Sequence, residues 1–303
     1  MDVIKTMRAV GLMSGTSLDG VDIAVIKTDG VDVYEFGRAY TVPYEDELRE
    51  SIRSVLGMKP DSPEHVSRIK LVENSLTAFH AMVVNEFLEG ESEPVDVIGF
   101  HGHTIHHEPE NHYTCQIGDG QMLADLTGIK VVSQFRTADV RAGGQGAPLV
   151  PVYHAALCAE MEKPVAVLNI GGVSNLTWIG ANGEMLAFDT GPGNAPVNDW
   201  VFRHAGMHMD YNGKLAISGK VNEHILSSLM KHKYFAMYPP KSIDRNIFNE
   251  KLEHLEGLSL EDGAATATAF AAEAIAYSIS FFLPESPKSL IICGGGANNP
   301  TLV

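Results

Sequence analysis

The chain is poor in cysteine and has no obvious export or membrane signal. Its 303 residues include three cysteines, Cys115, Cys158 and Cys293, an odd number with no close spacing. This pattern excludes a disulfide framework or a cysteine-based zinc site and indicates reduced thiols in the cytoplasm. The segment Met1–Arg8 lacks the apolar stretch of a secretory signal. No run of roughly 18 apolar residues is present, so we expect no membrane span.

Basic residues are also scarce. The chain has 22 Lys and Arg against 38 Asp and Glu, a net charge of −16 at pH 7. This balance disfavours nucleic acid or an anionic membrane as a partner. An anionic nucleotide can still bind locally, with a divalent cation to supply positive charge. The apolar content of 45% supports a sizeable core, and the length predicts one large or two medium domains.

The most informative stretch is GLMSGTSLDGVD at residues 11–22. Apolar segments at residues 8–12 and 21–26 flank its centre and predict two strands. Residues 14–20 are therefore expected to form a tight β-turn or hairpin rather than a loop that opens a helix.

The chemistry of this turn suits an anion. Gly15 and Gly20 can take positive φ and leave no Cβ in the way of a ligand, and Thr16 and Ser17 add hydroxyl donors. Successive main-chain N–H groups in such a turn bind anions. The turn has no lysine, so it is not the P-loop pattern, and a metal ion would supply the missing charge. An ordinary hairpin turn with the same composition is an equally good interpretation.

The order of predicted elements repeats. Each half opens with strand, Gly-rich turn, strand, turn and strand, which predicts two related domains. In the first half we expect strands at 8–12, 21–28, 33–42, 95–100, 114–117 and 129–132, and helices at 45–56, 62–89 and 120–127. In the second half we expect strands at 164–170, 176–179, 184–188 and 289–293, and helices ending near 160 and covering 195–204 and 259–282.

Three Gly-rich turns stand at strand ends in this scheme: residues 14–20, 171–175 and 294–299. Ligands of α/β proteins gather at strand ends, at the switch point between halves. The three turns together therefore predict a nucleotide cleft between two domains.

Five motifs give the chain a close resemblance to a known family. They are residues 11–22, 143–151 (GGQGAPLVP), 169–175 (NIGGVSN), 188–194 (FDTGPGN) and 292–299 (ICGGGANN). In this order, across essentially the whole chain, they resemble the anhydro-N-acetylmuramic acid kinases of the acetate and sugar kinase, Hsp70 and actin superfamily.

The resemblance implies an α/β fold of two related actin-like, ribonuclease H-like domains with mixed sheets and an interdomain nucleotide cleft. We expect the first domain at residues 1–135 and the second at 136–303, truncated at its C-terminus because the family continues past the third Gly-rich loop.

The implied reaction uses ATP and magnesium. Water cleaves the 1,6-anhydro bridge of anhydro-N-acetylmuramic acid and O6 is phosphorylated, which gives N-acetylmuramate 6-phosphate in cell-wall (peptidoglycan) recycling. We expect a cytoplasmic homodimer that binds a small sugar and neither nucleic acid nor membrane. The alternative is a nucleotide-gated binding protein or ATPase of the same superfamily without sugar kinase activity.

The motif match also implies site residues, whereas the magnesium ligands stay unknown. Asp189 matches the catalytic base, and an Asx-turn cap is its alternative role. The residues assigned to ATP are Gly15, Thr16, Ser17, Leu18, Asp19, Gly20, Val21, Asp22, Gly171, Gly172, Gly294, Gly295, Gly296 and Ala297. The residues assigned to the sugar are His101, His103, Arg136, Gln145, Gly146, Ala147, Gly191 and Asn194.

Some assignments keep alternatives. Arg136 is either a sugar ligand or a structural partner of Asp139. The histidines at 101, 103, 106 and 107 fit no common metal motif, so substrate contact is favoured over a metal hydrolase site. Gln134, Ile243 and Asp244 depart from the family pattern, which affects substrate detail and not the reaction class.

Overall fold

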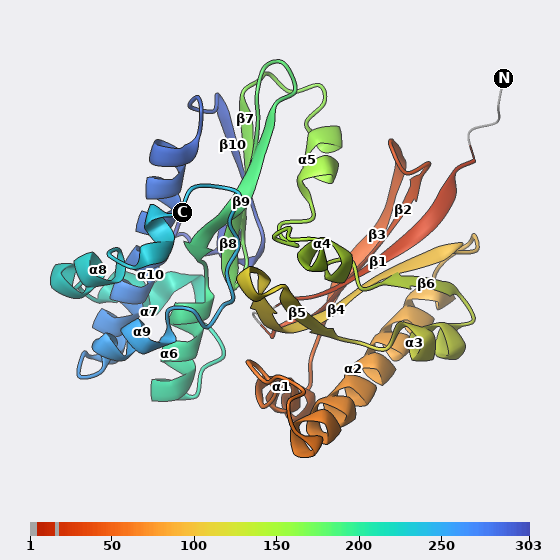
Figure 1. Ribbon diagram of the computed structural model, residues 1–303, viewed down its shortest axis with the longest axis horizontal. Helices are drawn as coiled ribbons and strands as arrows, with labels where there is room; N and C mark the ends of the chain where they lie inside the picture. The colour runs from red at the N-terminus through yellow and green to blue at the C-terminus, as the bar shows by residue number, and fades with distance from the viewer. Residues whose placement is uncertain (1–4, 16–17) are drawn as a thin grey trace. The chain divides into compact units, whose positions relative to one another are not determined.

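The computed structural model describes residues 5–15 and 18–303. The chain divides into two compact units: unit 1 ends at Gly146 and unit 2 begins at Ala147 (Figure 1). Thr16 and Ser17, both predicted to bind ATP, lie outside the described residues.

Unit 1 is built on a six-stranded mixed sheet with the order β3-β2-β1-β4-β5, in which β6 also pairs with β4. β1, β2 and β3 form an antiparallel meander, whereas β4 is parallel to both β1 and β6. The strands are β1 (Met7–Ser14), β2 (Gly20–Thr28), β3 (Val33–Pro43), β4 (Val97–Glu108), β5 (Tyr113–Ile117) and β6 (Lys130–Ser133).

β4 is longer than the sequence predicts. We expected a strand at residues 95–100 followed by a histidine loop, but all four histidines of this stretch lie on β4 itself. The first part of β4 pairs with β6, and from His103 onward it pairs with the antiparallel β5. The hydrogen bonds to β5 keep the histidine segment extended, and this partner is invisible in the local pattern.

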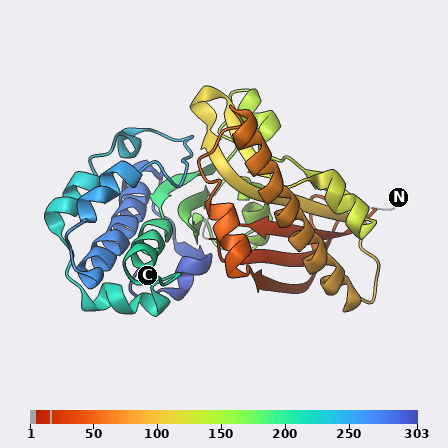
Figure 2. The ribbon, with the colours of Figure 1, turned by 90° about the horizontal axis from the view of Figure 1, so that it is seen from below.

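The helices of unit 1 cover the sheet. They are α1 (Asp46–Arg53), α2 (Pro63–Glu89), α3 (Gly120–Thr127) and α4 (Thr137–Arg141). α2 begins as predicted, because the Ser62 side chain accepts a hydrogen bond from the His65 N–H at 3.2 Å and Pro63 takes the first helical position. Its buried face, with Leu76 and Phe87, belongs to the same core as the β1 and β2 side chains, and α2 crosses these strands in Figure 2.

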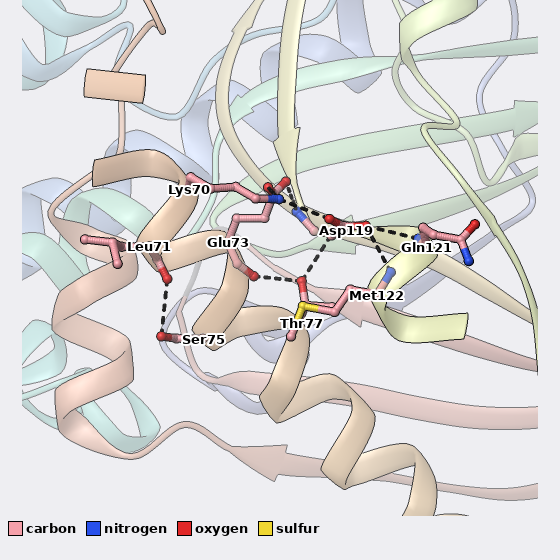
Figure 3. A network of polar contacts seen from close by, with 9 residues as sticks. Lys70, Leu71, Glu73, Ser75, Thr77, Asp119, Gln121 and Met122 are labelled. Carbon is pink, nitrogen blue, oxygen red and sulfur yellow. Dashed lines mark hydrogen bonds and ion pairs between the residues drawn. The ribbon is translucent and has the colours of Figure 1, made fainter. Parts of the chain in front are cut away.

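A polar network fastens the end of β5 and the start of α3 to α2 (Figure 3). Glu73 accepts a hydrogen bond from the Gly118 N–H at 3.1 Å, and Thr77 Oγ1 accepts one from the Asp119 N–H at 3.0 Å. Asp119 Oδ1 in turn caps α3 by accepting from the N–H groups of Gln121 and Met122. The loop after β5 is therefore held by side chains that project from one helix.

Unit 2 repeats the opening of unit 1. Its four-stranded sheet has the order β10-β7-β8-β9. β8 is antiparallel to both β7 and β9, and β10 is parallel to β7. The strands are β7 (Val165–Ile170), β8 (Val173–Ile179), β9 (Met185–Pro192) and β10 (Ser289–Cys293). Each unit is thus a three-stranded meander whose first strand pairs with a later parallel strand. This topology confirms the predicted fold class of two related actin-like, ribonuclease H-like sheets.

Helices pack around the sheet of unit 2 and against one another. They are α5 (Pro151–Leu157), α6 (Ala195–Ala205), α7 (Lys214–Ser218), α8 (Glu223–Leu229), α9 (Asn249–Leu252) and α10 (Leu260–Phe282). The 3₁₀-helices of the two units are η1 (Pro109–Asn111), η2 (Tyr211–Gly213), η3 (Lys233–Ala236), η4 (Glu253–Leu255) and η5 (Gly295–Asn298). The short elements α7, α9 and η4 were not predicted, because three to five residues leave little periodicity to detect.

α10 is the central helix of unit 2. It is capped as predicted by Ser259, whose hydroxyl accepts from the Asp262 N–H at 3.1 Å. By length and composition alone, α10 is long and apolar enough to cross a membrane. Of its most apolar window, 56% is buried within the protein, and Phe270 and Ala274 lie in an aromatic cluster of unit 2. These contacts are typical of the core helix of a folded unit.

Acid should destabilise unit 1 through His80, which is fully buried on α2. Its Nδ1 lies 2.8 Å from the Leu76 carbonyl oxygen, its ring packs 5.0 Å from that of Phe100, and burial lowers its pKa from 6.5 to about 4. Between these two pH values the unfolded chain binds one proton more at this position, so stability falls as the pH falls from 6.5 to about 4. In wild type, His80 should contribute a slope of about 1.4 kcal/mol per pH unit to the free energy of unfolding. The His80→Leu variant should lack this contribution.

Denaturant unfolding across that pH window measures the slope. The His254→Leu variant is the control, because His254 is exposed. Equal slopes for wild type and His80→Leu would contradict the assignment of a neutral His80.

Candidate active site

The predicted site residues fall in both units, and each unit is described by itself. Unit 1 holds Gly15, Leu18, Asp19, Gly20, Val21, Asp22, His101, His103, Arg136, Gln145 and Gly146. Unit 2 holds Ala147, Gly171, Gly172, Asp189, Gly191, Asn194, Gly294, Gly295, Gly296 and Ala297.

The first Gly-rich turn joins β1 to β2 as a hairpin, as predicted. The Leu18 N–H donates to the Gly15 carbonyl at 3.1 Å. Leu18, and not Gly20, has positive φ (63°), and its side chain is buried. Gly20 is needed for another reason, since a Cβ atom there would lie within 3 Å of the Val42 carbonyl oxygen on β3. The turn is therefore fixed by packing on both sides.

A buried polar cluster lies at the base of this turn. Ser14 Oγ, at the end of β1, is 2.5 Å from the Tyr44 hydroxyl and 2.7 Å from His103 Nδ1 on β4. All three residues are buried, and burial raises the pKa of Tyr44, which keeps its hydroxyl neutral. In this structure His103 thus binds the residue from which the turn begins, Ser14. Its predicted contact with sugar stays a prediction.

Arg136 and His101 meet at the loop that ends unit 1. Arg136 Nε donates to His101 Nε2 at 2.9 Å, and Arg136 Nη1 donates to the Gly146 carbonyl at 2.6 Å. His101 Nδ1 lies 2.8 Å from the Gly102 carbonyl, so Nδ1 carries the proton and Nε2 accepts. Burial, and secondly the Arg136 charge, lower the pKa of His101 to about 4, which keeps the ring neutral.

Asp139 holds the other side of the same loop. Its Oδ2 accepts a hydrogen bond from the Gly146 N–H at 2.7 Å, while Arg136 binds the carbonyl of Gly146. Arg136 and Asp139 therefore clamp one peptide segment between them. The structure brings together His101, Arg136 and Gly146, three of the predicted sugar ligands.

In unit 2 the second Gly-rich turn is shorter than predicted. It consists of Gly171 and Gly172, because Ser174 and Asn175 already pair with β9 as part of β8. Small polar residues suggested a longer turn, but this ladder keeps them extended. The Gly171 and Gly172 carbonyls accept hydrogen bonds of 2.8–3.1 Å from the N–H groups of residues 193–195. No described residue accepts a hydrogen bond from the Gly172 N–H, so this donor can serve a ligand.

The third Gly-rich segment packs on the same turn. It forms η5 and not an open loop. A Cβ atom on Gly294, whose φ is 81°, would lie within 3 Å of Asn169 Oδ1 and of the Ile170 carbonyl oxygen. The side chain of Asn194 donates to that same carbonyl at 3.3 Å. Segments 171–172, 193–195 and 294–296 therefore converge at one end of β7.

Asp189 lies at the same end of the sheet, where the carboxyl ends of β7, β9 and β10 meet. Within β9 it is paired with Asn175, which is paired with Asn169 on β7, which is paired with Cys293 on β10. Directly paired residues share a face, so these four side chains form a row close to the carboxyl ends of β7, β9 and β10. A register shift follows Asp189, where Thr190 bulges between two pairs, and such bulges commonly re-aim side chains next to functional sites.

The Asp189 carboxyl group is held by main-chain donors. It is 5% exposed, and its Oδ2 accepts a hydrogen bond from the Ile243 N–H at 2.9 Å. The Asp189 N–H donates to the Lys241 carbonyl at 3.0 Å. Ile243 departs from the family pattern, but it contributes only its N–H to this bond, which any residue other than proline can supply.

The sequence did not predict the burial of Lys241. Its side chain is 1% exposed, and its Nζ lies 4.0 Å from the Phe282 ring centroid and 4.5 Å from that of Tyr234. Burial lowers the pKa of Lys241 to about 8, and the charge of Asp189 partly opposes this shift. Lysine is almost never fully buried, so no local signal could have found it.

A metal centre built from side chains is not found in the described part of the chain. Within residues 5–15 and 18–303, no group of three or more His, Cys, Asp and Glu residues is arranged to hold a metal ion. The histidines of β4 are engaged elsewhere: His107 Nδ1, for example, lies 3.0 Å from Thr114 Oγ1 on β5.

Comparisons with known proteins agree with the motifs. The family model described as anhydro-N-acetylmuramic acid kinase matches residues 7–303. The anhydro-N-acetylmuramic acid kinase of Paramagnetospirillum magneticum is 51% identical over 301 residues, which cover 98% of this chain and 82% of the relative. The enzyme of the same name from Rhizorhabdus wittichii is 48% identical over 303 residues, with 98% and 82% covered.

Similarity to solved structures is weaker. The activator of the 2-hydroxyisocaproyl-CoA dehydratase from Clostridium difficile, with bound ADPNP, aligns with a TM-score of 0.41 at 11% identity, over 99% of this chain and 82% of that chain.

The convergence of turns in unit 2 predicts that Gly294 tolerates no side chain. Gly294→Ala should lower the free energy of unfolding by about 1–3 kcal/mol more than Gly183→Ala. Both positions have positive φ, 81° and 86°, but only position 294 meets main-chain and side-chain atoms, whereas position 183 faces open space. Denaturant unfolding of both variants measures the difference, and equal losses would show that φ alone matters.

Proposed function

The chain belongs to the anhydro-N-acetylmuramic acid kinase family, and from this premise we propose which residues carry out the reaction. The protein uses ATP to open the 1,6-anhydro ring of anhydro-N-acetylmuramic acid and to phosphorylate O6, which gives N-acetylmuramate 6-phosphate for cell-wall recycling. Asp189 serves as the general base, and the Gly-rich turns hold the nucleotide.

One observation carries this assignment. Asp189, the Gly171–Gly172 turn and the segment that begins at Gly294 all lie at the carboxyl ends of β9, β7 and β10 in one sheet. In α/β folds this edge is where ligands bind. The arrangement supports a nucleotide next to the carboxylate, with both held by the same rigid strands.

Main-chain donors bind the ATP phosphates in this proposal. The N–H of Gly172 points to no described acceptor, and such a donor suits a phosphate oxygen. Gly294, Gly295, Gly296 and Ala297 line the adenosine. In unit 1 the hairpin of Gly15 and Leu18–Asp22, with Thr16 and Ser17, contributes further phosphate contacts.

Asp189 starts the chemistry. Its carboxylate takes a proton from the water molecule that attacks the anomeric carbon. The bond from that carbon to O6 breaks, and the electron pair stays on O6. O6 then forms a bond to the γ-phosphorus as the bond to the β,γ-bridging oxygen breaks, which releases ADP. General-base assistance of this kind contributes about 10²–10⁴-fold, and in-line positioning supplies much of the remainder.

Magnesium would be held chiefly by the nucleotide. Mg²⁺ in kinases binds phosphate oxygens, water and only one or two carboxylates, and the described residues contain no larger cluster of ligands. In the hairpin, Asp22 already accepts a hydrogen bond from the Thr41 hydroxyl, which leaves Asp19 as the carboxylate that could approach such an ion. When bound, it neutralises charge on the phosphates.

The sugar contacts complete the proposal. They come from His101, His103, Arg136, Gln145, Gly146, Ala147, Gly191 and Asn194. Among them, His101 accepts a hydrogen bond from Arg136 Nε and so helps to orient the guanidinium, a group that suits the carboxylate of a muramic acid. We also propose that the enzyme is a cytoplasmic homodimer and binds neither nucleic acid nor membrane, as the family resemblance implies.

Turnover with the anhydro sugar tests the function. Purified protein with ATP, magnesium and anhydro-N-acetylmuramic acid should give one ADP for each sugar that is both ring-opened and phosphorylated, and chelation of the metal with EDTA should abolish this turnover. ATP hydrolysis without a sugar product would favour a nucleotide-gated ATPase on the same fold.

Asp189→Asn tests the base. The amide can still accept the Ile243 N–H through its oxygen but cannot take a proton, so kcat should fall by about 10²–10⁴-fold while ATP affinity stays near that of wild type. Steady-state kinetics and nucleotide titration measure both. Asp210→Asn is the matched control, because Asp210 is 6% exposed, accepts the N–H groups of Leu215 and Ala216 at 2.9 Å and is not among the proposed site residues. Loss of stability without loss of kcat would make Asp189 a structural cap.

A further inference from the structure

Three residues of unit 2 form a closed ring of interactions around Asp189. The Tyr234 hydroxyl donates to the Asp189 carbonyl. The Tyr234 carbonyl accepts from Lys241 Nζ at 3.3 Å. The Lys241 carbonyl accepts from the Asp189 N–H at 3.0 Å. Each residue is therefore fixed by the other two, and Asp189 precedes Tyr234 by 45 residues in the sequence.

This ring of three hydrogen bonds also positions the segment that binds the carboxyl group of Asp189. Lys241 is two residues before Ile243, whose N–H binds Asp189 Oδ2 at 2.9 Å. The segment 241–243 runs beside β9, the edge strand of its sheet, and supplies both an acceptor and a donor to one residue. If this segment moves, the carboxylate of Asp189 moves with it.

The Lys241 ammonium sits in an aromatic enclosure. Tyr234 comes from η3, Phe282 from α10 and Phe188 from β9, with ring centroids 4.5, 4.0 and 5.8 Å from Nζ. The Tyr234 phenol from η3 faces the ammonium, and burial raises the pKa of Tyr234, so that phenol stays neutral. Among the described residues, the charge of Asp189 is the one that favours the ammonium form of Lys241.

Burial of this charge is unfavourable for folding. Because the pKa of Lys241 falls from 10.5 unfolded to about 8 folded, the unfolded chain binds more protons between these values, and the cost is fully present below about pH 8. A long apolar side chain would fill the same enclosure without that cost. Stability alone therefore does not account for a lysine at this position.

We propose that Lys241, with Tyr234, is the positioning unit of the catalytic base: its ammonium anchors segment 241–243 on β9, aligns the Asp189 carboxyl group and favours its ionised form. This inference rests on the proposed role of Asp189 as the base. Lys241 acts through Asp189 and needs no contact with substrate.

Lys241→Met tests the proposal, since methionine fills the enclosure without charge. It should lower kcat by about tenfold or more, but by no more than the 10²–10⁴-fold that a base contributes, and leave the KM for ATP near wild type. In wild type, kcat should decline as the pH rises through about 8, where Lys241 loses its proton. The variant should lack this alkaline decline, which a purely structural role would not remove.

Two further variants sharpen the result. Lys163→Met is the matched control, because Lys163 Nζ also donates to main-chain carbonyls, those of Cys158, Ala159 and Met161, at 2.7–3.0 Å, and kcat should stay unchanged. Tyr234→Phe removes only the hydroxyl bond to the Asp189 carbonyl and should also lower kcat. If Lys241→Met does not fold, Tyr234→Phe decides: wild-type kcat in that variant overturns the proposal.

A binding-independent measurement separates this inference from the proposed function. In ¹³C-lysine NMR the Lys241 ε-carbon should titrate near pH 8 in wild type and at lower pH in Asp189→Asn, because the attracting charge is gone. An unmoved titration, or a folded Lys241→Met with wild-type kcat and pH profile, overturns the positioning role. An inactive wild type with the shifted titration would instead refute the kinase assignment and leave the coupling intact.

Discussion

The close approach of main chain to main chain at the ends of β7, β9 and β10 is the constraint on which unit 2 depends. The Gly171 and Gly172 carbonyls bind the N–H groups of residues 193–195, and a Cβ atom on Gly193 would lie within 3 Å of the Gly171 carbonyl oxygen. Segment 294–296 closes on the same turn. These contacts engage the carbonyl oxygens of the turn. The Gly172 N–H, which donates to no described residue, therefore remains at this end of the sheet for a ligand.

That donor matters in a protein with a net charge of −16. The charge of the whole surface repels a nucleotide, so binding has to come from short-range donors. In unit 1, the guanidinium of Arg49 on α1 donates to the carbonyls of Leu18 and Tyr44 at 3.0 and 2.7 Å. Carbonyl oxygens near the hairpin are thereby engaged, and a positive charge lies behind it.

The sequence predicted those features whose cause is local. Ser62 and Pro63 fixed the start of α2, and Ser259 that of α10, because caps act within one turn of helix. The repeated meander followed from apolar segments and turns. The predicted end of β4 and the predicted length of the turn after β7 were wrong, because each depends on pairing with a distant strand. The burial of Lys241 was beyond prediction for the same reason: its enclosure is assembled from η3, α10 and β9.

Two neighbouring parts of unit 2, the phenylalanine cluster and the surroundings of Lys241, affect stability in opposite ways. The cluster of Phe235, Phe248 and Phe270 packs stacked and edge-on rings, an arrangement that favours stability. Beside it, Lys241 and Asp189 place an ammonium and a carboxyl group in nearly water-free surroundings, which costs stability unless each group is bound. The rigid aromatic packing keeps both groups in place without water. Asp189 lies near the carboxyl ends of β7, β9 and β10, so the unfavourable burial of the Lys241 charge occurs beside the residue proposed as the base.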